Sequence, residues 1–192
     1  MSVDWSLFRI LNGLAGRSPA LDGLIRLLMN DYLITTGLVL FLFTLWFSGR
    51  SQQERECNQL AAPSAVVAMF AGNLFIKLLN LLFYRARPFA AHAVHLLFYR
   101  PSDSSFPSNA TSVGFSMATA VWFFNRKAGL AMYVLASLLG FSRIVGGVHY
   151  PIDVLAGALV GIAAGYVVVK KLPVLQRLWR AIIRFMRRWV LA

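Results

Sequence analysis

Two segments of the chain bring a histidine, a carboxylate and arginines to spacings that suit phosphate chemistry. In the later segment, Pro151 follows His149 closely, and Asp153 lies four residues after the histidine. Proline is favoured in the first helical turn, where its missing N–H costs nothing, so we expect His149 at a helix N-terminus. Asp153 is then placed to accept the Nδ1–H of the ring and to leave Nε2 free as a nucleophile or base. Arg143, just upstream, is within reach of an anion on that histidine.

The earlier segment predicts a second anion site of the same kind. Pro107 and Ser108 predict a helix start, where the Ser108 hydroxyl and the free N–H groups can hold an anion. Arg87 adds a planar fork that matches phosphate oxygens. Taken alone, such a histidine is often a structural cap and such an arginine a snorkelling anchor. Together they indicate a functional site, because ionisable groups are costly in an apolar chain.

The composition indicates what kind of scaffold holds these residues. The chain has 192 residues, of which 58% are hydrophobic and 14% charged, and its mean hydropathy is +0.64. A soluble domain carries roughly 25% charged residues to cover its surface, so we expect most of this chain to lie in lipid. The net charge of +12 would suggest nucleic acid as the partner of a soluble protein, but here we expect membrane lipids and no nucleic acid. The single cysteine, Cys57, excludes an internal disulfide and a Cys-based zinc site.

Long apolar segments predict an all-α, polytopic transmembrane bundle. They lie at residues 32–48, 58–83, 110–124, 128–142 and 151–169. A bilayer core needs about 20 residues per helix, so we expect five spans, or six if 19–30 also crosses. Amphipathic patterns predict interfacial helices in residues 1–30 and a basic helix on an anionic leaflet in 172–192. The expected organisation is one membrane-embedded domain over 1–171, followed by that basic helix.

The last apolar segment carries Gly157, Gly161 and Gly165, a small residue at every fourth position. This spacing allows close helix–helix approach. It favours tight packing within one chain and leaves a homodimer as the alternative.

Lysine and arginine residues predict the orientation in the membrane. Cytoplasmic connections are enriched in these residues, and one set of connections holds Arg50, Arg55, Arg126, Lys127, Lys170 and Lys171. The loop at 84–107 and the turn at 143–150 belong to the opposite set. We therefore expect both to face the periplasm or cell exterior of a bacterial plasma membrane, side by side.

These motifs resemble the type-2 phosphatidic acid phosphatase superfamily. The residues that carry the resemblance are Arg87-Pro88, Pro107-Ser108, and Arg143, His149 and Asp153 at intervals of six and four. The finer pattern resembles the bacitracin-resistance branch of undecaprenyl pyrophosphate phosphatases, over about residues 4 to 170. It consists of Arg87-Pro88-Phe89 with His92 and His95, and of Ser105-Phe106-Pro107-Ser108.

The resemblance implies that His149 attacks phosphorus and forms a phosphohistidine, with Asp153 orienting it and no metal or cofactor taking part. Phosphate oxygens would be held by Arg87, Ser108, Asn109 and Arg143. The implied reaction converts undecaprenyl pyrophosphate, an isoprenyl pyrophosphate lipid, to the monophosphate and inorganic phosphate. Such an enzyme recycles the lipid carrier of peptidoglycan synthesis and confers bacitracin resistance.

Two positions depart from the family pattern. The family has a lysine seven residues before the arginine of Arg87-Pro88, and this chain has Asn80 there. Lys77, one turn earlier, or Arg85 could supply the charge. The family also has a general-acid histidine two residues after Ser108, and this chain has Ala110.

Ala110 leaves two explanations open. One is natural divergence, with His92 or His95 as the acid. The other, which we favour, is a deliberate His-to-Ala change that impairs turnover and keeps the phosphate site. His92 and His95 could also bind pyrophosphate, pack in the loop, or form a zinc site with Asp103, although we expect no metal. A non-catalytic binder of lipid pyrophosphate and a lipid transporter or flippase are the alternatives to an enzyme, because neither needs a reactive His149.

Overall fold

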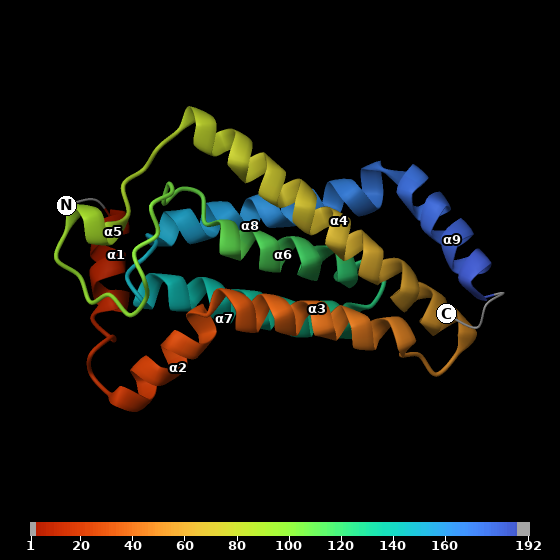
Figure 1. Ribbon diagram of the computed structural model, residues 1–192, viewed down its shortest axis with the longest axis horizontal. Coiled ribbons are helices and arrows are strands. Elements are labelled where there is room, and N and C mark those ends of the chain that lie inside the picture. Colours follow the sequence, from red (N-terminus) through yellow and green to blue (C-terminus); the bar gives the residue numbers. More distant parts are fainter. Residues whose placement is uncertain (1–2, 188–192) are drawn as a thin grey trace.

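The computed structural model describes residues 3–187, and all regular structure in this range is helical (Figure 1). The all-α class predicted from the sequence is confirmed. Residues 188–192, the end of the predicted basic helix, lie outside the described residues. The helices are α1 (Val3–Asn12), α2 (Pro19–Met29), α3 (Asp31–Phe47), α4 (Gln52–Leu82), α5 (Pro88–Ala91), α6 (Asn109–Trp122), α7 (Arg126–Val145), α8 (Pro151–Tyr166), the π-helical turn η1 (Val167–Lys171) and α9 (Pro173–Arg187).

Polar side chains cap the N-termini of α4 and α7. The Ser51 hydroxyl accepts the Glu54 N–H at 3.1 Å before α4, and the Asn125 side chain accepts the Ala128 N–H at 3.1 Å before α7. Each cap satisfies one of the N–H groups that a helix start leaves free. These caps set where the chain reverses direction.

Three helices are long and apolar enough to cross a membrane: α4, α7, and α8 continued through η1. The pair formed by α2 and residues 32–47 of α3, bent by 56°, counts as a fourth span if it is taken together. The expected five or six spans are therefore not confirmed. The predicted segment at 110–124 forms α6, which has only 14 residues and a length of about 21 Å.

α6 is the central helix, and α4, α7 and α8 surround it (Figure 1). The glycine stripe of α8 lies against it. A Cβ at Gly157 would lie 2.3 Å from the Ser108 carbonyl oxygen, and one at Gly161 would lie 2.5 Å from that of Ser112. The prediction of tight packing within one chain is confirmed, because the stripe is occupied by α6.

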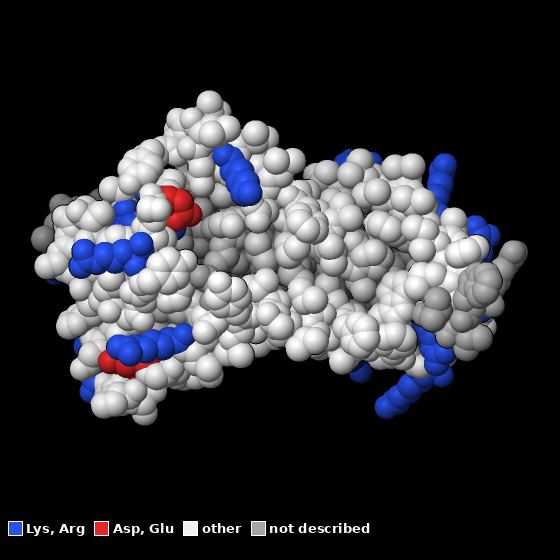
Figure 2. Space-filling model, in the orientation of Figure 1, with Lys and Arg blue, Asp and Glu red and all other residues white. Residues whose placement is uncertain are grey.

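The two ends of the bundle differ in their connections. The long connection between α4 and α6 and the α7–α8 turn meet at one end with α1, and the α3–α4 and α6–α7 connections lie at the other (Figure 1). The expected convergence of loop 84–107 with turn 143–150 is thus confirmed. On the face shown in Figure 2, charged side chains lie toward both ends and the middle is uncharged. At the second end, α9 packs on α4, and Arg187 donates to the Gln59 side chain at 3.2 Å.

Candidate active site

A cavity of about 360 Å³ opens at the end of the bundle where the two predicted loops meet. Five predicted site residues line it, together with Asp103 of the α4–α6 connection. These are Arg87, Asn109, Ala110, Arg143 and His149. Residues from four separate parts of the chain therefore share one cavity, as the motifs predict.

His149 is held in one tautomer. Its side chain is nearly buried, with the residue 4% exposed, and Nδ1 lies 2.8 Å from the Ser105 carbonyl oxygen. A carbonyl oxygen can only accept a hydrogen bond, so Nδ1 carries the ring proton. Nε2 is then unprotonated, and its lone pair accepts a hydrogen bond from Arg87 Nη1 at 3.2 Å.

The predicted role of Asp153 as the direct acceptor from His149 is wrong in its geometry. The nearest Asp153 oxygen lies 3.9 Å from Nδ1, beyond hydrogen-bonding range. That oxygen instead accepts the Ser105 hydroxyl at 2.5 Å and the Tyr150 N–H at 3.0 Å. Asp153 closes the first turn of its own helix, so its carboxylate points to the backbone and to Ser105, and it acts on His149 through Ser105.

The surroundings of His149 keep its ring neutral. Burial lowers the pKa of His149 well below its ordinary value, and the positive charges of Arg87 and Arg143 lower this pKa further. The hydrogen bond to the Ser105 carbonyl raises the pKa but does not offset these effects. A neutral imidazole with an unprotonated Nε2 is the form that can attack an electrophile.

Two nearly buried arginines give the cavity its positive charge. Arg87 is 6% exposed and donates to the Asp103 carboxylate at 2.8 Å and to the Val148 carbonyl at 3.0 Å. Arg143 is 4% exposed, and its guanidinium lies 4.9 Å from the centre of the Phe98 ring. Guanidinium groups fixed beside His149 suit the oxygens of a phosphate group.

Arg85 does not line this cavity, which corrects the expectation that it supplies charge to the phosphate. Its guanidinium pairs with Asp4 at 2.5 Å and with Asp153. Two carboxylates, one on α1 and one on α8, therefore hold Arg85. Burial lowers the pKa of Arg85, but the hydrogen bond and charge of Asp4 and the charge of Asp153 outweigh it, so the net shift is upward and Arg85 stays cationic.

Ser108 also differs from its expected place. It is completely buried, its hydroxyl accepts from the Thr111 hydroxyl at 3.0 Å, and its N–H donates to the Asp153 carbonyl at 2.9 Å. It is absent from the cavity lining, whereas the next two residues, Asn109 and Ala110, line it. Ser108 joins α6 to α8 behind the cavity wall.

Lys77 and Asn80 line a neighbouring cavity of about 400 Å³ beside α4. Asp103 and Asn109 border both cavities. The Asn80 and Asn109 carboxamide oxygens are buried without a hydrogen-bond partner. The α4 residues named from the sequence thus lie next to the His149 cavity and do not line it.

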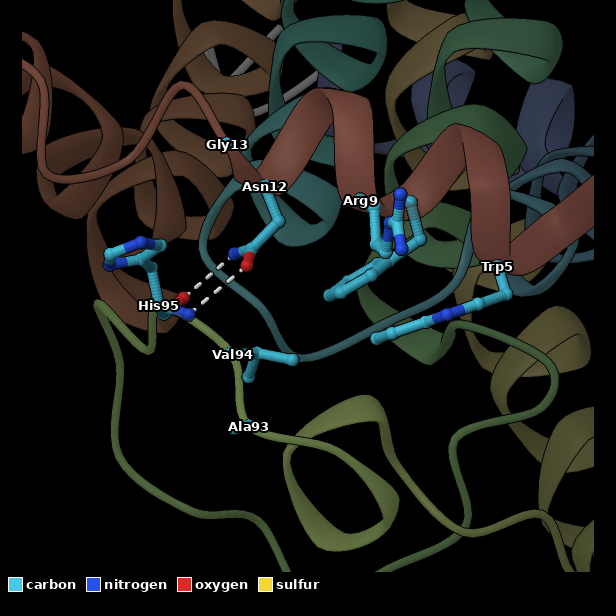
Figure 3. A pocket seen from close by; sticks show the side chains of 8 residues that line it. Trp5, Arg9, Asn12, Gly13, Ala93, Val94 and His95 are labelled. Carbon is cyan, nitrogen blue, oxygen red and sulfur yellow. Dashed lines mark hydrogen bonds between the residues drawn. The ribbon is translucent and has the colours of Figure 1, made fainter. Parts of the chain in front are cut away.

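The two loop histidines lie elsewhere. The His92 ring stacks on Trp5, with ring centres 3.8 Å apart, and His95 lines a separate cavity of about 470 Å³ beside α1 (Figure 3). Neither lines the His149 cavity. Within residues 3–187, no group of three or more His, Cys, Asp or Glu side chains is arranged to hold a metal ion. His92, His95 and Asp103 therefore do not form the zinc site that the sequence left open.

The sequence interpretation missed three polar residues around the site. Ser105 orients His149, Asp103 holds Arg87, and Asp4 holds Arg85. The sequence signal for Ser105 is its place in the segment 105–108, three residues before Ser108. Asp4 lies 149 residues before Asp153, and no local pattern connects them.

Comparison with known proteins agrees with this geometry. The family model of the PAP2 superfamily matches residues 61–177, and undecaprenyl-diphosphatase BcrC of Bacillus subtilis is 33% identical over 85% of this chain and 81% of its own. The chain belongs to the PAP2 superfamily. Its resemblance to phosphatases of this superfamily, expected from the motifs, is therefore confirmed.

Two further relatives extend the match. The bacitracin transport permease protein BcrC of Bacillus licheniformis is 33% identical over 88% of this chain and 80% of its own. The crystal structure of Aquifex aeolicus LpxE has a TM-score of 0.68 and 30% identity, covering 88% of this chain and 96% of that one. The PAP2 relatives and the long apolar helices together support a membrane phosphatase that acts on a lipid phosphate.

Proposed function

We propose that this protein hydrolyses undecaprenyl pyrophosphate to undecaprenyl phosphate and inorganic phosphate at the outer face of a bacterial plasma membrane. The observation that carries the proposal is the neutral His149, whose unprotonated Nε2 lies in a cavity with Arg87 and Arg143. The relative named undecaprenyl-diphosphatase supports the choice of substrate. The expected consequences are recycling of the cell-wall lipid carrier and resistance to bacitracin.

In this mechanism, His149 Nε2 attacks the terminal phosphorus, the Nε2–P bond forms, and the bridging P–O bond breaks. Undecaprenyl phosphate leaves with the bond electrons. Water then attacks the phosphohistidine, which releases inorganic phosphate and restores the imidazole. Arg87 and Arg143 stabilise the charge on the transferring phosphoryl oxygens. Arg87 can exchange its present contact with Nε2 for a phosphate oxygen.

The neighbouring cavity suits the lipid-linked phosphate of the same substrate. Lys77 and Asn80 line it on the side of α4, and Asn109 borders both cavities. The exposed apolar residues Leu78 and Leu81 lie at its edge. An isoprenyl chain can therefore remain in the bilayer while its two phosphates lie in adjoining cavities.

Ala110 leaves the proposed enzyme without its general acid. It lines the His149 cavity, so an imidazole at this position would reach the leaving phosphate. His92 and His95 are not in the cavity lining, which disfavours them as replacements. We therefore propose that the chain is impaired by the alanine, which we interpret as a deliberate replacement of histidine, and that it retains its phosphate site. Because of this alanine, a non-catalytic binder of lipid pyrophosphate is the second candidate function.

Phosphate release from undecaprenyl pyrophosphate, measured on the purified protein in detergent with EDTA, tests the proposal. General acid catalysis contributes about 10²–10⁴-fold, so we expect Ala110→His to raise kcat at least about a hundredfold with little change in KM. Adding His149→Ala to that variant should abolish release and leave binding largely intact.

Three outcomes separate the candidates. If Ala110→His binds the lipid without releasing phosphate from any lipid phosphate, the protein is a binder or transporter and the enzyme proposal is wrong. Undiminished release by His149→Ala would mean that another residue is the nucleophile. Rapid release that Ala110→His does not improve would place the acid elsewhere.

A further inference from the structure

The N-terminal helix α1 is joined by polar contacts to three segments at the catalytic end. At its C-terminal end, the buried Asn12 side chain donates to the His95 carbonyl at 2.7 Å and to the Val145 carbonyl at 2.8 Å. It also accepts the His95 N–H at 3.0 Å. Figure 3 shows this pairing of Asn12 with the His95 backbone. These contacts hold the α4–α6 connection and the end of α7 against α1.

The N-terminal end of α1 makes the corresponding contact with α8 through Asp4. This residue is 6% exposed. One carboxylate oxygen accepts the Ile152 N–H at 3.0 Å, in the first turn of α8. The other accepts from Arg85 at 2.5 Å. An uncompensated charge at such a buried position is costly, so Asp4 and Arg85 require one another.

Arg85 carries the connection from Asp4 to Asp153. Its Nη2 donates to Asp4 and its Nη1 to Asp153. The guanidinium carbon lies 4.1 Å from the centre of the Tyr150 ring, which limits its movement on one side. Arg85 therefore holds Asp153 at a defined place at the start of α8.

Asp153 in turn holds Ser105, and Ser105 holds the nucleophile. The Asp153 carboxylate accepts the Ser105 hydroxyl at 2.5 Å, and the Ser105 carbonyl accepts the Nδ1–H of His149 at 2.8 Å. The Ser105 N–H also donates to the Arg85 carbonyl at 2.9 Å, so a displacement of Arg85 reaches both the hydroxyl contact and the backbone that carries this acceptor. Without that acceptor, only the hydrogen bond from Arg87 to Nε2 would favour the Nδ1–H tautomer. The other tautomer, in which Nε2 carries the proton and cannot attack, would then become more populated.

We propose that Asp4 is a positioning residue for the nucleophile and that α1 is a required part of the active site. Asp4 never touches the substrate. It keeps Arg85 on Asp153, and through Ser105 it keeps His149 in the Nδ1–H tautomer. This inference rests on the proposed role of His149 in the reaction, although the tautomer can be measured without any substrate.

Apolar packing keeps α1 in place when the charge of Asp4 is removed. Phe8 is completely buried, and its ring centre lies 5.5 Å from that of Tyr150. Trp5 stacks on Phe8 at 5.4 Å. Asp4→Asn is nearly isosteric and retains an oxygen that can accept the Ile152 N–H. It therefore removes the charge that holds Arg85 without undocking the helix.

The experiment compares Asp4→Asn, Asp4→Glu and Asp22→Asn, each made in the full-length chain with and without Ala110→His. Asp22 is the matched control, because its carboxylate accepts the Gly16 N–H at 2.9 Å and lies on α2, outside the proposed network. Phosphate release gives kcat and KM. The ¹⁵N NMR spectrum of the three histidines gives the tautomer of His149 in the free protein.

We expect Asp4→Asn to lower kcat at least about tenfold, as loss of a residue that orients a catalytic group does. KM should change less than about twofold, because Arg87 and Arg143 keep their places. The His149 signal should shift from the Nδ1–H tautomer to a mixture. Asp4→Glu should retain more activity than Asp4→Asn, and Asp22→Asn should match the starting chain.

Two results would overturn the inference. One is an unchanged His149 tautomer in Asp4→Asn; the other is a proportional loss in Asp22→Asn, which would indicate a general loss of stability. If no variant releases phosphate but the tautomer shifts in Asp4→Asn alone, the proposed function fails and the positioning role remains. An unfolded Asp4→Asn that Asp4→Glu does not rescue would show that Asp4 has a structural role only.

Discussion

At the residue scale, different neighbours set the tautomer and the charge of His149. The Ser105 carbonyl determines which nitrogen carries the proton. Burial and the two arginines determine that the ring has only one proton at neutral pH. A backbone acceptor is suited to the first task, because it cannot take the proton from Nδ1 and so never competes with it as a base.

The lowered pKa of His149 predicts how activity depends on pH. The attacking imidazole must be unprotonated, and its pKa lies well below the ordinary 6.5. We expect kcat/KM of the Ala110→His variant to stay level as the pH falls to 6.5 and to decline only at lower pH, where His149 becomes protonated. A pH profile of phosphate release measures this decline.

A ¹⁵N NMR titration of His149 in the free protein serves as the control. It reports the same pKa without any contribution from ionisation of the substrate. Protonation of His149 above pH 6.5 would contradict the prediction and would mean that the arginines do not act on the ring as their positions suggest.

At the element scale, the packing of α8 on α6 sets the geometry of the cavity. The glycine stripe of α8 brings the two backbones together, and the Ser108 N–H bonds to the Asp153 carbonyl at the end near the site. Asn109 and Ala110 on α6 are thereby placed beside His149, which precedes α8. A change in the separation of these two helices would therefore move Asn109 and Ala110 relative to His149.

Gly161→Ala is expected to destabilise the protein by about 1–3 kcal/mol, the usual cost of overpacking. The new Cβ would lie 2.5 Å from the Ser112 carbonyl oxygen and 2.9 Å from the Ser116 nitrogen, so the helices must separate. Thermal unfolding in detergent measures the effect. A variant as stable as the starting chain would mean that α6 and α8 are not packed as closely as described.

Gly37→Ala is the matched control for this substitution. Gly37 also lies within a helix, but a Cβ there would have no neighbour within 4 Å. Alanine is the better helix former by roughly 0.5–1 kcal/mol. We therefore expect Gly37→Ala to be neutral or slightly stabilising.

At the scale of the whole molecule, the number of lysine and arginine residues distinguishes the two ends. At the catalytic end, Arg85 and Arg87 are paired with carboxylates. The opposite end carries Arg126, Lys127, Lys170 and Lys171. A bundle with this asymmetry is expected to keep its more basic end in the cytoplasm.

Thiol labelling with a membrane-impermeant reagent tests that orientation. Cys57 is the single cysteine and lies at the start of α4, at the end opposite the cavity. Intact cells should leave it unlabelled until they are permeabilised. Ser102→Cys in a Cys57→Ser background should be labelled in intact cells, because Ser102 is exposed beside the cavity. The reverse pattern would contradict the proposed orientation.

The sequence by itself determined the helical class, the apolar scaffold, and the histidine and the two arginines of the cavity. Hydrophobic segments and capping residues are local signals. They predict helices wherever the apolar residues form a long segment or recur at the helical period. Arg87, Arg143 and His149 were recognisable because each lies in a short motif. The common face of loop 84–107 and turn 143–150 followed from charge counting, because positive residues mark the sides of a membrane.

Only the tertiary structure decided how the polar groups pair. Asp153 could reach His149 by its spacing, but its carboxylate is taken by Ser105, Arg85 and the Tyr150 N–H. Ser108 is expected at the phosphate from its motif, but it is completely buried and does not line the cavity. Arg85 is expected to replace a missing lysine, but it is paired with Asp4 and Asp153 instead. The number of spans also differs from the expectation, because α6 ends at Trp122 after only 14 residues and is too short to count as a span. Several groups far apart in the chain can pair with the same side chain. Which of them does so depends on the distances between them, and these are defined only when the helices are packed.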